Sequence, residues 1–164
     1  LIQEGIMPTM ENLLHVIYDF SKSLQSVSKV VQHLKDKGNW DSQCESASVA
    51  LQQAYMCRMY DVCDLLIQEG IPPRMENMPF LINGQQSRKY VSKVVQNLKD
   101  KGNWNPLCES ASVALQNSYM CRMYDICDLL IEEGIPPRME NLLLVINDSW
   151  SSKYSVSRVV NHLK

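Results

Sequence analysis

Glycine recurs in this chain at a nearly fixed spacing, and that spacing restricts the fold more than any other feature. Apart from Gly84, successive glycines are 33, 32, 32 and 32 residues apart. A fixed period between roughly 20 and 50 residues is typical of repeat proteins. The flanking sequence agrees, because residues 38–70 and 102–134 differ at only seven positions. The five periodic glycines are Gly5, Gly38, Gly70, Gly102 and Gly134.

Two unit types alternate with a superperiod of about 64 residues. Type 2 units contain the near-identical segments, and type 1 units begin at Ile6, Ile71 and Ile135. We interpret residues 1–164 as one repeat array. Residues 1–5 match residues 66–70, so we expect them to be the end of a preceding helix in a longer array, with the last unit truncated. The predicted hairpins are 6–38, 39–70, 71–102, 103–134 and 135–164.

Each type 2 unit is long enough for two helices. We expect the first helix over residues 42–57, with Asp41 as its N-cap. In the second copy Asn105 takes the cap position and Pro106 the first helical position. The second helix is expected over residues 60–69, ended by Gly70 in a left-handed conformation.

Type 1 units predict helices over residues 10–19 and 27–37. In the middle copy Pro79 falls inside the first helix, which should therefore start late or kink. No segment alternates apolar and polar residues for long, so we predict no sheet.

The apolar faces require stacking. The first type 2 helix has a face of mostly small residues, which allows a neighbouring helix to approach closely. A single 32-residue hairpin cannot bury such faces, whereas stacked hairpins can, as in an α-solenoid. The residues on this face are Cys44, Ala47, Leu51, Ala54 and Tyr55.

Residues 54–73, AYMCRMYDVCDLLIQEGIPP, resemble the second half of a pentatricopeptide motif, and residues 118–137 repeat the pattern. The chain is thus similar to the tetratricopeptide and pentatricopeptide class of helical-hairpin repeats, although its period is shorter than their roughly 34 residues. The resemblance implies an all-α fold: a right-handed α-solenoid of stacked antiparallel helical hairpins with a period of about 32 residues. It also implies RNA binding as an alternative function.

The opposite face of the first type 2 helix is the candidate ligand surface. It mixes apolar, amide and acidic side chains, which suits a peptide or protein ligand, with methionine making adaptable contacts. The alternative is that its valine and methionine pack on the adjacent repeat. The residues are Glu45, Val49, Gln52, Gln53 and Met56 in one copy and Glu109, Val113, Gln116, Asn117 and Met120 in the other.

RNA readout of pentatricopeptide type would use polar side chains near the start of the first type 1 helix. Pro79 and Leu143 stand at the aligned positions, and Asn77 and Asn141 are either polar contacts or caps. Basic residues concentrate in the second type 1 helices and acidic residues in the second type 2 helices. This alternation favours pairing between neighbouring repeats over a continuous phosphate-binding track.

The six cysteines contain no Cys-x-x-Cys pair, which disfavours zinc. We interpret them as small buried residues in a reducing, intracellular compartment, the cytoplasm or nucleus. Cys57 and Cys121, beside Arg58 and Arg122, are the ones to test for reactivity if exposed. We find no nucleophile–base pattern and expect no enzyme, metal or cofactor.

The copies differ most in the type 1 turns. These are either tolerant loop tips or copy-specific contacts through Phe20, Arg88, Lys89 and Trp150. The sequence therefore predicts a non-enzymatic scaffold for a peptide or protein, with no membrane span. The alternatives are a pentatricopeptide-like RNA-binding module and an engineered or duplicated array without an evolved ligand. Terminal repeats without polar caps also predict end-to-end self-association.

Overall fold

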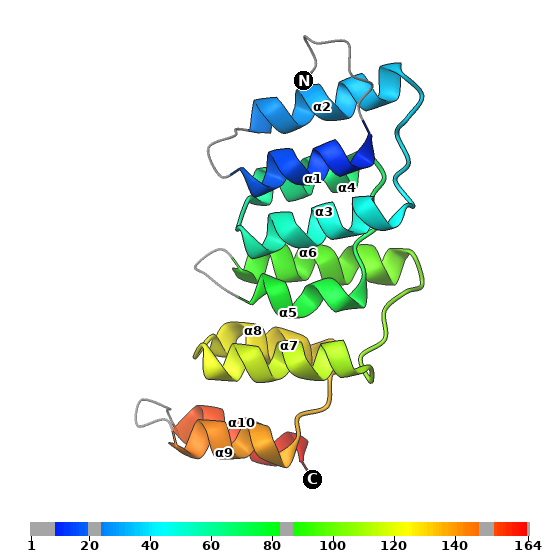
Figure 1. Cartoon of the computed structure of the whole chain (residues 1–164). Helices are drawn as coiled ribbons and strands as arrows, with labels where there is room; N and C mark the ends of the chain where they lie inside the picture. The colour runs from blue at the N-terminus through cyan, green and yellow to red at the C-terminus, as the bar shows by residue number, and fades with distance from the viewer. Residues whose placement is uncertain (1–8, 20–23, 83–86, 148–152, 164) are drawn as a thin grey trace. The chain divides into compact units, whose positions relative to one another are not determined.

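Helices account for all the regular secondary structure in the described part of the chain. The computed structural model describes residues 9–19, 24–82, 87–147 and 153–163, and within them it has ten α-helices, one short 3₁₀ helix and no strand (Figure 1). The predicted all-α class is therefore confirmed. The chain divides into two compact units, Leu1–Pro73 and Arg74–Lys164.

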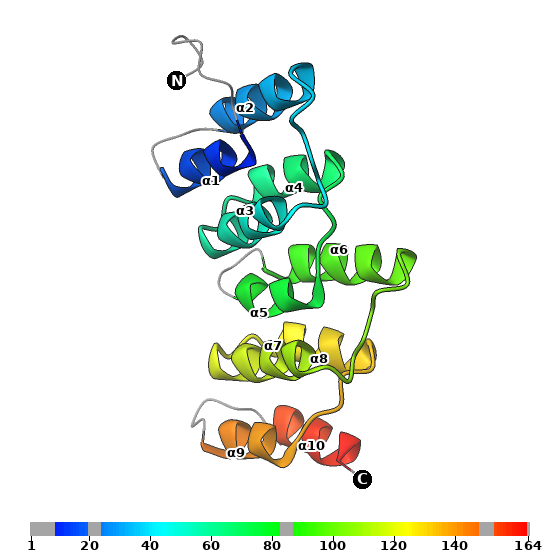
Figure 2. The same cartoon turned by 45° about the vertical axis from the view of Figure 1, so that its right-hand side comes forward.

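The first unit contains two helical hairpins. Its helices are α1 (Met10–Tyr18), α2 (Leu24–Asp36), α3 (Glu45–Met56) and α4 (Tyr60–Gln68). Consecutive helices pair, α1 packs on α3, and α2 packs on α4. The unit thus has two layers, with α1 and α3 in one and α2 and α4 in the other (Figure 2).

The second unit contains three hairpins in the same two-layer pattern. Here α7 contacts both α5 and α9, while α6 contacts α8, and α9 pairs with α10. The elements are the 3₁₀ helix η2 (Met75–Asn77), α5 (Met78–Leu81), α6 (Ser87–Asp100), α7 (Glu109–Met120), α8 (Tyr124–Glu132), α9 (Met139–Asn147) and α10 (Lys153–His162).

Pro79 divides the first helix of the middle type 1 copy, as predicted. One 3₁₀ turn, η2, precedes a four-residue α5 that has Pro79 near its start. The equivalent helices α1 and α9 are continuous and nine residues long. Proline lacks the N–H that a helix interior needs, so the helix begins late.

The periodic glycines end helices in the left-handed conformation, as predicted. Gly70 has φ +95° and Gly134 +93°, and the Gly70 N–H donates to the Ile67 carbonyl while the Ile71 N–H donates to that of Leu66. This hydrogen-bond pair is the Schellman motif. Gly38 and Gly102 have φ +70° and +69°. Gly5 and Gly84 lie outside the described residues.

Two arginines adopt the same left-handed conformation. Arg58 follows α3 with φ 57°, and Arg122 follows α7 with φ 59°. The Arg58 N–H donates to the Tyr55 carbonyl and the next N–H to that of Ala54, which again forms a Schellman motif. Glycine is usual at such positions because L-residues are strained there.

The predicted start of the first type 2 helix was wrong. Helices α3 and α7 begin at Glu45 and Glu109, three residues later than expected. The Asp41 carboxylate accepts the Gln43 N–H at 2.9 Å, and the Asn105 amide oxygen accepts the Leu107 N–H at 3.1 Å. These short bonds form Asx turns before the helix, and cysteines take the N-cap positions.

The predicted small-residue face is buried. Ala47, Leu51, Ala54 and Tyr55 are fully or almost fully buried, whereas Cys44, the N-cap, is half-buried. Helix α3 touches both α1 and α4, so one helix with small side chains fits between two neighbours.

Candidate ligand-binding faces

The predicted ligand surface of α3 is partly open to solvent. Met56 keeps 52% of its surface exposed, Glu45 and Val49 are exposed, and Gln52 and Gln53 are half-buried. Glu45, Gln52 and Met56 follow one another at intervals of seven and four residues, which places them on one side of the helix. We call Glu45, Gln52 and Met56 the α3 face.

Helix α7 repeats this arrangement in the second unit. Met120 is 62% exposed, Glu109 and Gln116 are exposed, and Val113 and Asn117 are half-buried. We call Glu109, Gln116 and Met120 the α7 face. Both methionines keep more than half of their surface exposed, so packing on an adjacent hairpin does not bury them.

One edge of the predicted surface does pack on a neighbouring hairpin. The Asn117 amide donates to the Pro79 carbonyl at 3.5 Å, and the Cys121 thiol donates to the Ile82 carbonyl at 3.8 Å. Both acceptors belong to or directly follow α5, which α7 contacts. Asn117 therefore has a packing role in this structure.

In the first unit the equivalent amide makes a different bond. Gln53 occupies the position of Asn117 and donates to the Sγ atom of Cys57 on its own helix, at 3.2 Å. The neighbouring helix that α3 contacts here is α1, which is continuous. Interior carbonyls of such a helix already accept hydrogen bonds from N–H groups one turn later. Helix α1 therefore offers the Gln53 amide no free carbonyl like that of Pro79.

The asparagines considered for RNA contact are caps. The Asn77 Oδ1 atom accepts the Arg74 N–H at 2.7 Å, and the Asn141 Oδ1 atom accepts the Arg138 N–H at the same distance. Asn12 makes the same 2.7 Å bond in the first copy. Asn77 and Asn141 are also buried, so neither presents its side chain to a base.

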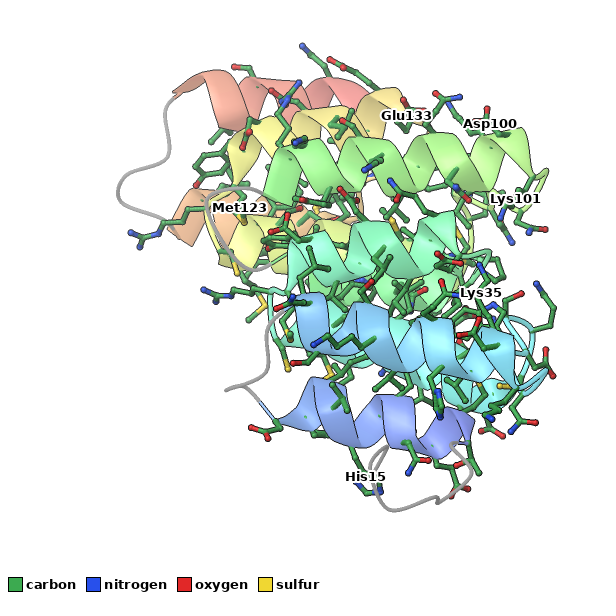
Figure 3. The ribbon with its side chains drawn as sticks, turned by 90° about the horizontal axis from the view of Figure 1, so that it is seen from above. His15, Lys35, Asp100, Lys101, Met123 and Glu133 are labelled. Carbon is green, nitrogen blue, oxygen red and sulfur yellow. The ribbon has the colours of Figure 1, made fainter. Side chains whose placement is uncertain are left out.

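Neighbouring hairpins are linked by ion pairs at repeated positions. Lys35 and Glu69 are 2.8 Å apart in the first unit, and Lys99 pairs with Glu133 in the second. In Figure 3 Glu133 lies toward the same end of the second unit as Lys101, the residue directly after α6. The predicted pairing of basic and acidic helices thus occurs in both units, although such exposed pairs stabilise little.

Two of the four predicted copy-specific contacts lie within the described residues. The Arg88 guanidinium donates to the Asp125 carbonyl at 2.6 Å and lies 3.8 Å from its carboxylate, which links α6 to α8. Lys89 is exposed, with its ammonium 5.8 Å from the ring centre of Tyr90. Phe20 and Trp150 lie outside the described residues.

All six cysteines are free, and only Cys63 and Cys127 are buried. The expectation that all six are buried was wrong: Cys121 is exposed, and the remaining three are half-buried near helix ends. Burial raises the pKa of the Cys63 thiol well above its ordinary value. Burial also raises the pKa of Cys127 to about 12, although a hydrogen bond to Ser118 opposes that shift.

The sequence reasoning missed the tryptophan bonds that close each type 2 hairpin. The Trp40 indole N–H donates to the Glu69 carbonyl at 3.2 Å, and the Trp104 indole donates to the Glu133 carbonyl at 3.1 Å. Each bond ties the linker before a hairpin to the end of its second helix. The signal was available, since both copies begin Gly-Asn-Trp.

The described residues contain no cluster of His, Cys, Asp or Glu side chains with the arrangement of a metal site. In that part of the chain, none of the helices combines the length and apolar character needed to cross a bilayer. Comparisons with models of known families, with curated proteins and with solved structures found no match.

Proposed function

We propose that this chain is a non-enzymatic helical-repeat scaffold, a right-handed α-solenoid of tetratricopeptide or pentatricopeptide type, that binds peptide or protein segments. The α3 face and the α7 face are each a binding surface. The observation that carries the proposal is the exposure of Met56 and Met120 at equivalent positions of two near-identical helices. Large apolar side chains left in water on two copies of one surface favour a contact role.

The chemistry of the two faces defines a ligand class. Methionine adapts its flexible side chain to varied apolar groups, and the neighbouring glutamine can donate to and accept from a peptide backbone. Glu45 and Glu109 add a carboxylate at the start of each helix. The expected ligand is a peptide with an apolar anchor residue and a lysine or arginine about one helix length away.

Binding of RNA is less well supported. The capping asparagines Asn77 and Asn141 are buried, and Lys35 and Lys99 already pair with acidic side chains. A phosphate-binding track would need unpaired cations in a continuous row.

A panel of random 12-residue peptides tests the proposal. The full chain is screened against the panel, and hits are titrated by fluorescence anisotropy with the Met56→Glu and Met120→Glu variants. We expect basic–apolar peptides to bind saturably and to bind at least about tenfold more weakly to the variant whose face they use, since a carboxylate opposes apolar contact. Leu107→Glu is the matched control, because Leu107 is 75% exposed and lies outside both faces.

Two results would contradict this function. Tight binding of heteropolymeric single-stranded RNA with a steep loss of affinity between low and high salt would favour the RNA-binding alternative. If no peptide in the panel binds saturably and RNA does not bind either, the result would favour an array without an evolved ligand.

A further inference from the structure

Two arginines hold a backbone conformation that this chain otherwise gives to glycine. Arg58 and Arg122 have φ 57° and 59°, and each lies in the turn between the two helices of a type 2 hairpin. All other residues with positive φ in the described part of the chain are glycines. A left-handed L-residue is strained, and strain kept at the same place in two hairpins favours a role for the side chain.

The side chain of Arg58 is exposed, and no ion pair within the described part of the chain involves it. Glu69, the acidic residue at the other end of α4, already pairs with a lysine of α2 at 2.8 Å. Figure 3 shows the corresponding arrangement in the second unit, where Met123, directly after Arg122, and Glu133 lie toward opposite ends of α8. The turn therefore presents a positive charge away from the paired acid of the hairpin.

Arg58 also lies next to the exposed methionine of the α3 face. Met56 ends α3, Cys57 follows it, and Arg58 comes next. The order along this surface is the carboxylate of Glu45, the amide of Gln52, the thioether of Met56 and the guanidinium of Arg58. An α-helix rises 1.5 Å per residue, so Glu45 and Met56 are about 16 Å apart along the axis. The surface thus has a negative end and a positive end, with an apolar side chain beside the positive end.

We propose that Arg58 selects peptides that carry an acidic side chain beside the apolar anchor. The inference rests on the proposed function of the α3 face and adds one requirement to its ligand. A guanidinium binds a carboxylate through two parallel hydrogen bonds, so the contact has a geometry as well as a charge. An extended peptide rises about 3.3 Å per residue. Its basic residue therefore lies about five residues from the anchor, and its acidic residue about two residues beyond the anchor on the other side.

A purely structural role for Arg58 gives a different expectation. A cation near the C-terminus of a helix interacts favourably with the helix dipole, so Arg58 could stabilise α3 with or without a ligand. That stabilisation does not depend on whether a bound peptide carries aspartate or asparagine. The dependence of affinity on the charge of the peptide therefore separates the two roles.

A pair of labelled 12-residue peptides tests the proposal. Both carry a lysine, a leucine and, beyond the leucine, either aspartate or asparagine at the spacings given above, in a background of serine and glycine. Each is also made in the reverse order. They are titrated by fluorescence anisotropy with the full chain carrying Met120→Glu, which blocks the α7 face, and with Arg58→Gln and Arg58→Gly added to it. Lys37→Gln is the matched control, because it removes an exposed cation outside both faces.

We expect the parent chain to bind the aspartate peptide about threefold more tightly than the asparagine peptide, as one exposed ion pair allows. Arg58→Gln and Arg58→Gly should bind both peptides alike, whereas Lys37→Gln should keep the preference. The preference should also decrease at high salt. Because Arg58→Gly relieves the strain at this turn, its lost preference should come without a loss of stability, which urea unfolding checks.

The outcomes separate this inference from the function on which it rests. If both peptides bind, Met56→Glu weakens both and aspartate gives no preference, the inference is wrong and the α3 face remains a peptide-binding surface. A preference that persists in Arg58→Gln also overturns the inference, because another cation is then responsible. If neither peptide binds in either order, the ligand class proposed for the α3 face is wrong, and the role of Arg58 is refuted with it.

Discussion

Replacing Gly38 by alanine tests the helix-ending role of the periodic glycines. Gly38 has φ +70°, and a Cβ atom built there meets nothing within 4 Å. The change therefore alters backbone energy without adding a clash or a packing contact. An L-residue in the left-handed region costs about 1–2 kcal/mol. Alanine also lowers the conformational entropy of the unfolded chain, which stabilises the folded chain by about 0.4–1 kcal/mol. We expect the free energy of unfolding to fall by about 1 kcal/mol.

The reverse change at Arg58 should act in the opposite direction. Arg58 has φ 57° and an exposed side chain. Glycine at this position removes the left-handed strain of about 1–2 kcal/mol but increases the freedom of the unfolded chain by about 0.4–1 kcal/mol. Arg58→Gly should therefore stabilise the chain by about 0.5–1 kcal/mol.

Urea unfolding followed by circular dichroism measures both effects. The free-energy differences follow from the transition midpoints and the slopes, and the slopes should not change. Lys37→Ala, at an exposed neighbour of Gly38, is the control and should stay within about 0.5 kcal/mol of the unchanged chain. The reasoning would be refuted if Gly38→Ala left the stability unchanged, or if Arg58→Gly destabilised the chain.

Three further predictions concern groups at the helix ends and in the core. Cys121 should react with a thiol reagent in the folded chain while Cys127 reacts only on unfolding, as read by mass spectrometry; fast labelling of Cys127 would contradict its burial. Because the folded pKa of Cys127 is about 12 against an ordinary value of 9.0, the folded chain keeps a proton that the unfolded chain loses. Its contribution to stability should be constant below about pH 9 and fall by about 1.4 kcal/mol per pH unit above it, a slope that urea titrations should find smaller in Cys127→Ala. Trp104→Phe removes the indole bond to Glu133 and should cost about 1 kcal/mol in the same urea assay; an unchanged midpoint would show that this bond stabilises nothing.

The helix ends were predictable from the sequence because glycine and proline act locally. A left-handed residue at Gly70 depends on a few neighbouring dihedral angles, and Pro79 acts on its own turn through its missing N–H. The small-residue face of α3 was also predictable, since its helical spacing is a property of that helix alone.

The helix starts were less predictable because two local structures compete. Asp41 and Asn105 are good N-cap residues, but the same side chains also form Asx turns with the N–H two residues on. The turn is formed here, and α3 and α7 begin later. Residue preference alone does not distinguish the two, because both satisfy the same side-chain oxygen.

The sequence predicted all the side chains of the candidate faces as ligand contacts. In the structure some of them are exposed and others pack against a neighbouring hairpin. Met56 and Met120 are exposed, whereas Asn117 reaches the Pro79 carbonyl. The difference depends on the neighbouring hairpin: where proline shortens α5, a helix carbonyl becomes available to an amide from α7. The sequence contained both residues, but only the fold shows that residues 38 apart form a hydrogen bond.

The pair α1 and α9 shows why burial cannot be assigned from a helix's own sequence. The two helices differ only where α1 has His15 and Tyr18 and α9 has leucine and asparagine, so a periodicity argument places Ile17 and Ile146 on the same apolar side. Yet Ile17 is fully buried while Ile146 is 55% exposed. What differs is the type 2 helix that packs on α1, which begins 27 residues after α1 ends. Hydrophobic pattern defines which side of a repeat helix needs a partner, and the partner itself is defined by the neighbouring unit.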